Sequence, residues 1–180
     1  MNATANVHPA YRDIDHPINL NLGVIQGGDW PSTVAGDCTM RFRMGLLPGS
    51  TCDEMRHRIQ AVINDATGGD PWLTENPPKV VFRGFAAEPC EVDTTHPAME
   101  QLARSHHTVE GKPALPLNAT CTTDVRFFNL NYNTVATCYG PRARHIHGAD
   151  ECVSIDSMRQ VALVMAHFIT QWCNTEEASQ

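Results

Sequence analysis

The sequence has few basic residues and few charged residues of any kind. Its 180 residues include 13 Lys and Arg against 20 Asp and Glu, so the formal net charge is −7, and charged residues make up only 18%. Because a surface of this sign repels phosphate backbones, we expect no nucleic-acid partner. The low charged fraction indicates that another chain or segment covers part of the surface.

The sequence also lacks a long hydrophobic run. The longest, residues 161–169, is interrupted by His167 and is far shorter than the roughly 18 residues that a membrane span requires. The first nine residues have neither a basic start nor an apolar stretch, so we expect no signal peptide. These features predict a cytoplasmic protein without a membrane partner.

Several chemical motifs are absent as well. The seven cysteines form no C-x-x-C pair and no spacing typical of a disulfide framework, which favours reduced thiols. The sequence has no G-x-S-x-G elbow, no Walker pattern and no G-x-G-x-x-G. We therefore assign no catalytic residue.

Hydrophobic patterning predicts the order strand, strand, helix, strand in the first half. Apolar and polar residues alternate over residues 18–24 and 38–46, as in two antiparallel strands. Thr51, with Glu54 three residues later, forms a capping box that opens a helix. Residues 79–87 are rich in Val and Phe, which indicates a third strand.

The pattern changes near residue 92, which indicates a domain boundary. Pro97 is tolerated in a first helical turn, so we predict a helix over residues 96–107, with His106 and His107 in a solvated C-cap. Residues 134–139 are short and apolar enough for a buried strand. A long amphipathic helix follows Ser154, with its apolar positions at Ile155, Met158, Ala162, Met165, Ile169 and Trp172. The fold class is therefore α+β.

Two short segments carry candidate functional residues. His145 and His147 would place both imidazoles on one side of an extended segment, just before two acids. One or two metal ligands fit this pattern, as does a solvated loop whose acids favour the start of the following helix. Asp124 and Arg126 fit either a guanidinium that grips a ligand carboxylate or a structural ion pair.

Six motifs, in order from about Pro17 to Cys173, together resemble the M20 metallopeptidase family. The closest similarity is to its acetylornithine deacetylase-like and succinyl-diaminopimelate desuccinylase-like deacylases. The motifs are Gly27-Gly28-Asp29-Trp30-Pro31-Ser32-Thr33-Val34, Arg41-Phe42-Arg43 with Pro48-Gly49, Asp70-Pro71-Trp72-Leu73 with Pro77-Pro78, Thr123-Asp124-Val125-Arg126-Phe127-Phe128, Cys138-Tyr139-Gly140-Pro141 and Ile146-His147-Gly148-Ala149-Asp150-Glu151.

The resemblance implies two parts and three site residues. Residues 1–92 look like a partial lid and dimerisation domain, and residues 93–180 look like the C-terminal part of an α/β zinc-hydrolase catalytic domain. His147 matches the last metal-ligand histidine of the family. Arg126 matches the region that holds the substrate carboxylate, and Ser32 falls where many members carry a lid asparagine that reaches the substrate.

The resemblance also implies that most of the active site lies elsewhere. The family's H-x-D metal motif, bridging aspartate, glutamate pair and lid histidine should precede this segment, and none is found here. A complete relative would hold two zinc ions and cleave a small N-acyl amino acid. We expect this chain to be a C-terminal portion that is inactive alone and that forms a homodimer through the lid or joins a complementing N-terminal half. A non-enzymatic dimerisation module is the alternative.

Overall fold

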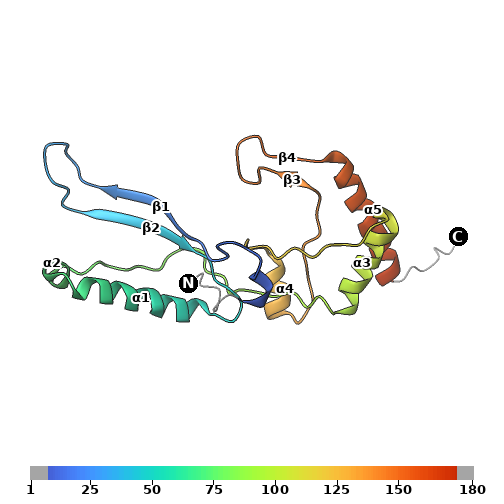
Figure 1. Ribbon diagram of the computed structural model, residues 1–180, viewed down its shortest axis with the longest axis horizontal. Helices are drawn as coiled ribbons and strands as arrows, with labels where there is room; N and C mark the ends of the chain where they lie inside the picture. Colours follow the sequence, from blue (N-terminus) through green and yellow to red (C-terminus); the bar gives the residue numbers. More distant parts are fainter. Residues whose placement is uncertain (1–7, 174–180) are drawn as a thin grey trace. The chain divides into compact units, whose positions relative to one another are not determined.

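The computed structural model describes residues 8–173, which form two compact units (Figure 1). Unit 1 contains the residues up to Cys90 together with Asn118–Thr122, and unit 2 contains Glu91–Leu117 and the residues from Thr123 onward. Helices and small two-stranded sheets occur in both, as the α+β class requires. The assignment of residues 1–92 to a lid and of residues 93–180 to a catalytic domain stays a prediction.

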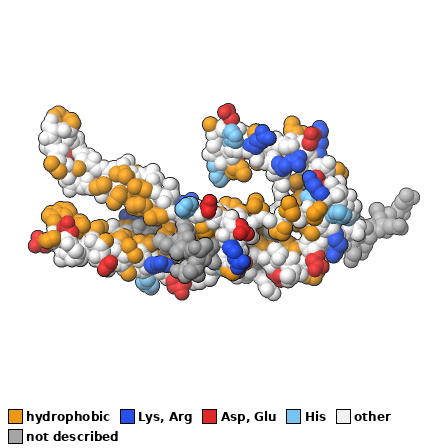
Figure 2. All heavy atoms as spheres, in the orientation of Figure 1, with side chains coloured by type: hydrophobic (Ala, Val, Ile, Leu, Met, Phe, Trp, Pro, Cys, Tyr) orange, Lys and Arg blue, Asp and Glu red, His pale blue; other side chains and the backbone are white. Residues whose placement is uncertain are grey.

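The two strands predicted first are confirmed as an antiparallel hairpin in unit 1. Strand β1 spans Leu20–Gly27 and strand β2 spans Cys38–Met44. Apolar side chains gather on one face of this hairpin and are 40–62% exposed; they are Leu20, Leu22, Ile25, Met40 and Phe42. Figure 2 shows hydrophobic side chains on the visible face of this hairpin.

A bulge at Gly23 decides which side chains share the apolar face. Gly23 has no partner in β2, and the register then resumes with Val24 opposite Arg41 and Ile25 opposite Met40. The extra residue shifts the alternation by one position. Val24, predicted to continue the apolar side, therefore lies on the opposite face, and Ile25 takes its place.

The predicted capping box is confirmed at the start of helix α1, which spans Cys52–Gly68. The Glu54 amide donates to Thr51 Oγ1 at 3.2 Å, and the Thr51 amide donates to Glu54 Oε2 at 2.8 Å. The Cys52 amide donates to a Glu88 carboxylate oxygen at 3.0 Å. Three donors of the first turn are thus satisfied by side chains. A short helix α2, Pro71–Glu75, follows.

The third strand predicted over residues 79–87 does not form. No ladder pairs this segment with β1 or β2 within the described residues. Gly84 adopts a φ of +76°, a left-handed conformation that interrupts an extended run. The segment is held instead by side chains, since the Arg43 guanidinium lies 5.6 Å from the centre of the Phe85 ring.

Helices α3 and α5 pack side by side in unit 2 (Figure 1). Helix α3 spans Pro97–Glu110 and helix α5 spans Ile155–Trp172, so both predicted helices are confirmed. Between them lie a short helix α4, Val125–Asn131, and a small hairpin of β3, Ala143–Arg144, and β4, Cys152–Val153. Over residues 8–173, no helix combines the length and apolar character needed to cross a membrane.

The buried side of α5 is not the one that the sequence predicts. Val164 and Ser157 are 0% and 6% exposed, and His167 Nδ1 lies 3.0 Å from Oγ of the fully buried Ser105 on α3. The predicted stripe is exposed instead, with Ile155 65% and Ile169 52% exposed. The side of α5 that packs on α3 therefore differs from the stripe that the sequence predicts.

The strand predicted over residues 134–139 is also absent. The Asn129 side chain acts in place of a neighbouring strand: its Nδ2 donates to the Ala136 carbonyl at 2.9 Å, and its Oδ1 accepts from the Ala136 amide at 2.9 Å. Both backbone groups of Ala136, within this apolar segment, are therefore satisfied by a side chain of α4.

Candidate functional site

The candidate residue His147 lies in the exposed loop between β3 and β4. The backbone of this loop turns repeatedly, with φ values of 55° at His145, 62° at His147 and 59° at Asp150. Left-handed residues other than glycine cost on the order of 1–2 kcal/mol each. The predicted extended segment with both imidazoles on one side is wrong, because the chain must reverse between strands of two residues each. Figure 2 shows His and acidic side chains at this loop.

Both histidines of the loop are exposed, and hydrogen bonds inside the loop involve His145. The Gly148 amide donates to the His145 carbonyl at 2.7 Å, and His145 Nδ1 lies 3.3 Å from the Ala149 carbonyl oxygen. A Cβ at Gly148 would lie 3.1 Å from the His145 oxygen, so glycine allows this close approach. The two histidines therefore have different surroundings although they are two residues apart.

The Arg126 guanidinium is held by residues close to it in the chain. The side chain is 11% exposed, its Nη1 donates to the Thr123 carbonyl at 2.9 Å, and the guanidinium carbon lies 4.1 Å from the centre of the Phe127 ring. Asp124 Oδ1 is 3.7 Å away, but this carboxylate is 92% exposed and the pair adds little stability. The contacts that hold the guanidinium are thus the Thr123 carbonyl and the Phe127 ring rather than the ion pair. A contact with a substrate carboxylate stays a prediction.

Ser32 lies in the exposed loop that joins β1 to β2. A turn orders this part of the loop, because the Thr33 amide and hydroxyl both donate to the Trp30 carbonyl, at 3.2 and 3.1 Å. Ser32 belongs to unit 1, whereas Arg126 and His147 belong to unit 2. Its contact with a substrate stays a prediction.

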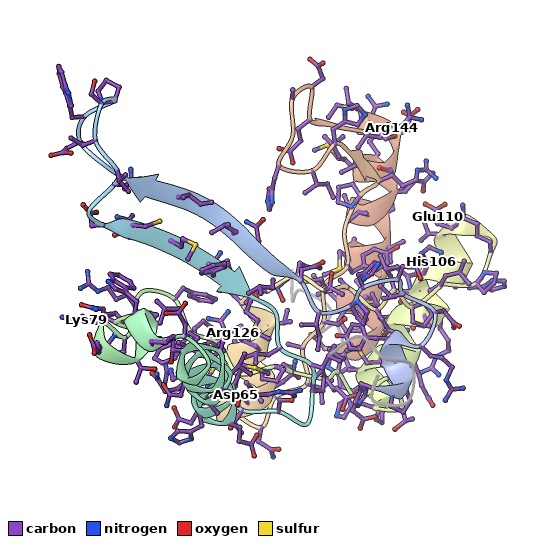
Figure 3. The ribbon with its side chains drawn as sticks, turned by 60° about the vertical axis from the view of Figure 1, so that its left-hand side comes forward. Asp65, Lys79, His106, Glu110, Arg126 and Arg144 are labelled. Atoms are coloured by element: carbon purple, nitrogen blue, oxygen red, sulfur yellow. The ribbon has the colours of Figure 1, made fainter. Side chains whose placement is uncertain are left out.

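The sequence does not predict a contact between polar side chains of α3 and Tyr139. His106 Nδ1 lies 2.7 Å from the Tyr139 hydroxyl oxygen, and both side chains are half-buried. Burial raises the pKa of Tyr139 above its ordinary 10.0, and the nearby Glu110 carboxylate raises this pKa further. Figure 3 labels His106 and Glu110, which project from one helix. The prediction that His106 is a solvated cap is therefore wrong. Its partner Tyr139 lies 33 residues away, and no local pattern in the sequence indicates the contact.

The described residues do not by themselves fit a catalytic metal. Over residues 8–173, no group of three or more His, Cys, Asp or Glu side chains is arranged to hold a metal ion. A catalytic zinc site takes three protein ligands and keeps a fourth position for water or substrate. His147 is a suitable donor, but one imidazole does not make such a site.

Comparison with known proteins establishes the family. The sequence profile of the peptidase family M20/M25/M40 matches residues 9–171, a range that includes parts of both units. The chain belongs to this family. The membership inferred from the six ordered motifs is therefore confirmed, and enzymes of the M20 family are hydrolases that generally depend on a metal.

Two curated relatives are similar to most of this M20 chain. An N-formyl-4-amino-5-aminomethyl-2-methylpyrimidine deformylase of Bacillus subtilis is 27% identical over 168 residues, and a deformylase of the same name from Halalkalibacterium halodurans is 20% identical. Each alignment covers 88% of this chain and 39% of the relative. The chain thus spans well under half the length of the curated relatives that it matches.

Proposed function

We propose that this chain forms part of a metal-dependent amidohydrolase that removes a small acyl group from an amine nitrogen. Membership of the M20 family supports the hydrolase class. The two deformylases among its relatives support a formyl group, and the similarity to acetylornithine deacetylase-like enzymes supports N-acetyl and N-succinyl amino acids as further substrates. The shared chemistry is hydrolysis of an N-acyl bond.

The observation that carries this proposal is the conformation of the loop that presents His147. Three of the five described non-glycine residues with positive φ lie within residues 145–150. Backbone strain of this kind persists where surrounding structure maintains it, and it concentrates at functional sites. We propose that the loop presents His147 as one metal donor to a zinc site whose other ligands and general base lie outside the described residues.

The remaining site residues take supporting roles in this proposal. When the substrate is an N-acyl amino acid, Arg126 places a positive charge beside its carboxylate, while the Thr123 carbonyl holds the guanidinium. Ser32, on the loop of the β1–β2 hairpin, contacts the substrate from the lid. Neither residue moves a proton; both bind and orient the substrate.

The exposed side of α5 supports a complementing polypeptide as the partner. Ile155, Met158 and Ile169 are 65%, 48% and 52% exposed on a helix whose other side already packs on α3. An apolar stripe of this length is typical of a covered helix face. Because 39% of each relative is matched here, we propose that the unmatched remainder of such a protein covers this face and supplies the missing ligands.

The test compares the purified chain with a complemented mixture. The chain with zinc should show no turnover on an N-formyl aminopyrimidine or on N-acetyl and N-succinyl amino acids. Adding a polypeptide that corresponds to the unmatched part of the Bacillus subtilis relative should restore hydrolysis. The substitution His147→Ala should abolish the restored activity, whereas His107→Ala, at an exposed histidine of α3, should retain it. Turnover by the chain alone, or full activity of His147→Ala, would contradict the proposal.

A non-enzymatic dimerisation module is the second candidate, and the β1–β2 hairpin favours it. Within the described residues its two strands pair only with each other, and its apolar face is exposed. A free sheet edge is a template for another strand. Sedimentation of the same purified chain separates the two: a stable dimer that no complement activates favours this candidate, and a compact monomer excludes it.

A further inference from the structure

We propose that Ser157 is a positioning residue for the loop that carries His147. Ser157 lies in the first turn of α5, one turn after the N-cap residue Ser154, and it is 6% exposed. Its hydroxyl contacts the backbone of Arg142, the residue just before β3. The inference rests on the proposed function only for the role of His147 itself.

The β3–β4 hairpin is too small to hold a strained loop unaided. Its ladder contains two residue pairs, Ala143 with Val153 and Arg144 with Cys152. An isolated hairpin even of ordinary length is marginally stable in water. The left-handed conformations at His145, His147 and Asp150 therefore require support from outside the two strands.

Ser157 provides this support through two hydrogen bonds. Its Oγ accepts from the Arg142 amide at 2.9 Å and donates to the Ser154 carbonyl at 2.9 Å. The Ser154 amide in turn donates to the Arg142 carbonyl at 3.0 Å. Both backbone groups of Arg142, the residue that precedes β3, are thus tied to the start of α5. The base of the hairpin is fixed to a helix that is itself packed on α3.

Capping of α5 and anchoring of the hairpin depend on different serines. Ser154 Oγ accepts from the Ser157 amide at 3.3 Å, which is an ordinary N-cap bond. Loss of the Ser154 hydroxyl leaves the bonds to Arg142 in place, because Ser154 contributes to them only through its backbone. Loss of the Ser157 hydroxyl removes the acceptor of the Arg142 amide but keeps the cap. The two serines form a matched pair.

The experiment follows the backbone of the loop by nuclear magnetic resonance in the full chain. In Ser157→Ala, amide exchange at Arg142 should accelerate at least about tenfold, because this N–H loses its acceptor. Exchange at Gly148 should accelerate as well, because its bond to the His145 carbonyl depends on the loop conformation. The scalar couplings and carbon shifts of His145 and His147 should no longer report a uniformly positive φ. In Ser154→Ala, the first turn of α5 should fray while the loop signals stay as in the parent chain. Unchanged loop signals in Ser157→Ala, or equal changes in both variants, would overturn the inference.

A second pair of variants keeps the test decisive if Ser157→Ala does not fold. Ser157→Thr retains a hydroxyl, and Ser157→Val introduces a side chain with the shape of threonine but without a hydroxyl. We expect the loop conformation to persist with Thr and to be lost with Val; identical behaviour of the two overturns the inference. If Ser157→Ala loosens the loop while His147→Ala stays active in the complemented mixture, the proposed function fails and the positioning role stands.

Discussion

The two units bury their side chains in different ways. In unit 2, α3 packs on α5, and Val164 and Ser105 are fully buried. The His167 ring is within hydrogen-bond distance of the Ser105 hydroxyl. In unit 1, the β1–β2 hairpin leaves large apolar side chains such as Ile25 and Phe42 more than half exposed. Unit 1 buries Leu47 and Met55 and begins α1 with a capping box.

The difference shows that a pair of helices can bury a small core, whereas a two-stranded hairpin cannot bury either of its faces. Each helix satisfies its own backbone, so two helices need only matching sides to bury a core. A hairpin satisfies half of its backbone groups and has two faces, and a single partner strand covers neither. Unit 2 is therefore expected to respond strongly to core substitutions, and unit 1 to substitutions at its caps.

The largest expected effect on stability is the loss of a buried valine in unit 2, compared with the loss of an exposed valine in unit 1. Val164→Ala in α5 should lower the free energy of unfolding by about 2 kcal/mol, because Val164 is 0% exposed and its truncation leaves a cavity. Val62→Ala in α1, where the valine is 61% exposed, should change it by less than about 0.5 kcal/mol. The gain in helix propensity is shared by both variants. Amide exchange along each helix measures the change in free energy in each variant. Equal changes would contradict the conclusion that the two units are packed differently.

A smaller effect is expected at the cap of α1. Thr51→Ala removes the acceptor of the Glu54 amide and should destabilise the helix by about 1 kcal/mol. Thr51→Ser keeps a hydroxyl acceptor and serves as the control. The measurement is amide exchange in the first turn of α1. If Thr51→Ala and Thr51→Ser exchange alike, the capping box does not support unit 1.

The smallest effect is a pH dependence confined to unit 2. Burial and Glu110 raise the pKa of Tyr139 above 10.0, so the neutral phenol is favoured in the folded state. This contribution to stability is fully present below about pH 10 and is lost as the pH rises through the folded-state pKa. Tyr139→Phe should weaken the alkaline loss of stability of α3 and α5, and Glu110→Gln should reduce it in part. An alkaline loss in Tyr139→Phe equal to that of the parent chain would contradict this assignment.

The elements that the sequence predicts correctly share one property. The capping box at Thr51, the proline start of α3 at Pro97 and the serine cap of α5 at Ser154 all involve residues within one helical turn. The alternation of β1 and β2 is equally local. Interactions over three or four residues can be recognised from spacing alone, so these elements and the family motifs are predictable.

The elements that failed depend on residues far away in the chain. The strands predicted over residues 79–87 and 134–139 need a neighbouring strand, and the described structure supplies side chains from Arg43 and Asn129 instead. In the candidate site, the motif predicts His147 as a metal ligand, which stays a prediction, whereas no motif predicts the left-handed loop or the contact of His106 with Tyr139. Neither the loop conformation nor this contact produces a periodic pattern in the sequence.

The sequence alone determined where helices begin, which segments alternate as strands and which family the chain belongs to, because each depends on short-range spacing or ordered motifs. The tertiary structure alone decided which side of α5 is buried, how the loop of His147 turns and which hydroxyl anchors it. The physical reason is that a helix side or a strained turn has its energy set by the partner that packs against it, and that partner is chosen by the fold rather than by neighbouring residues.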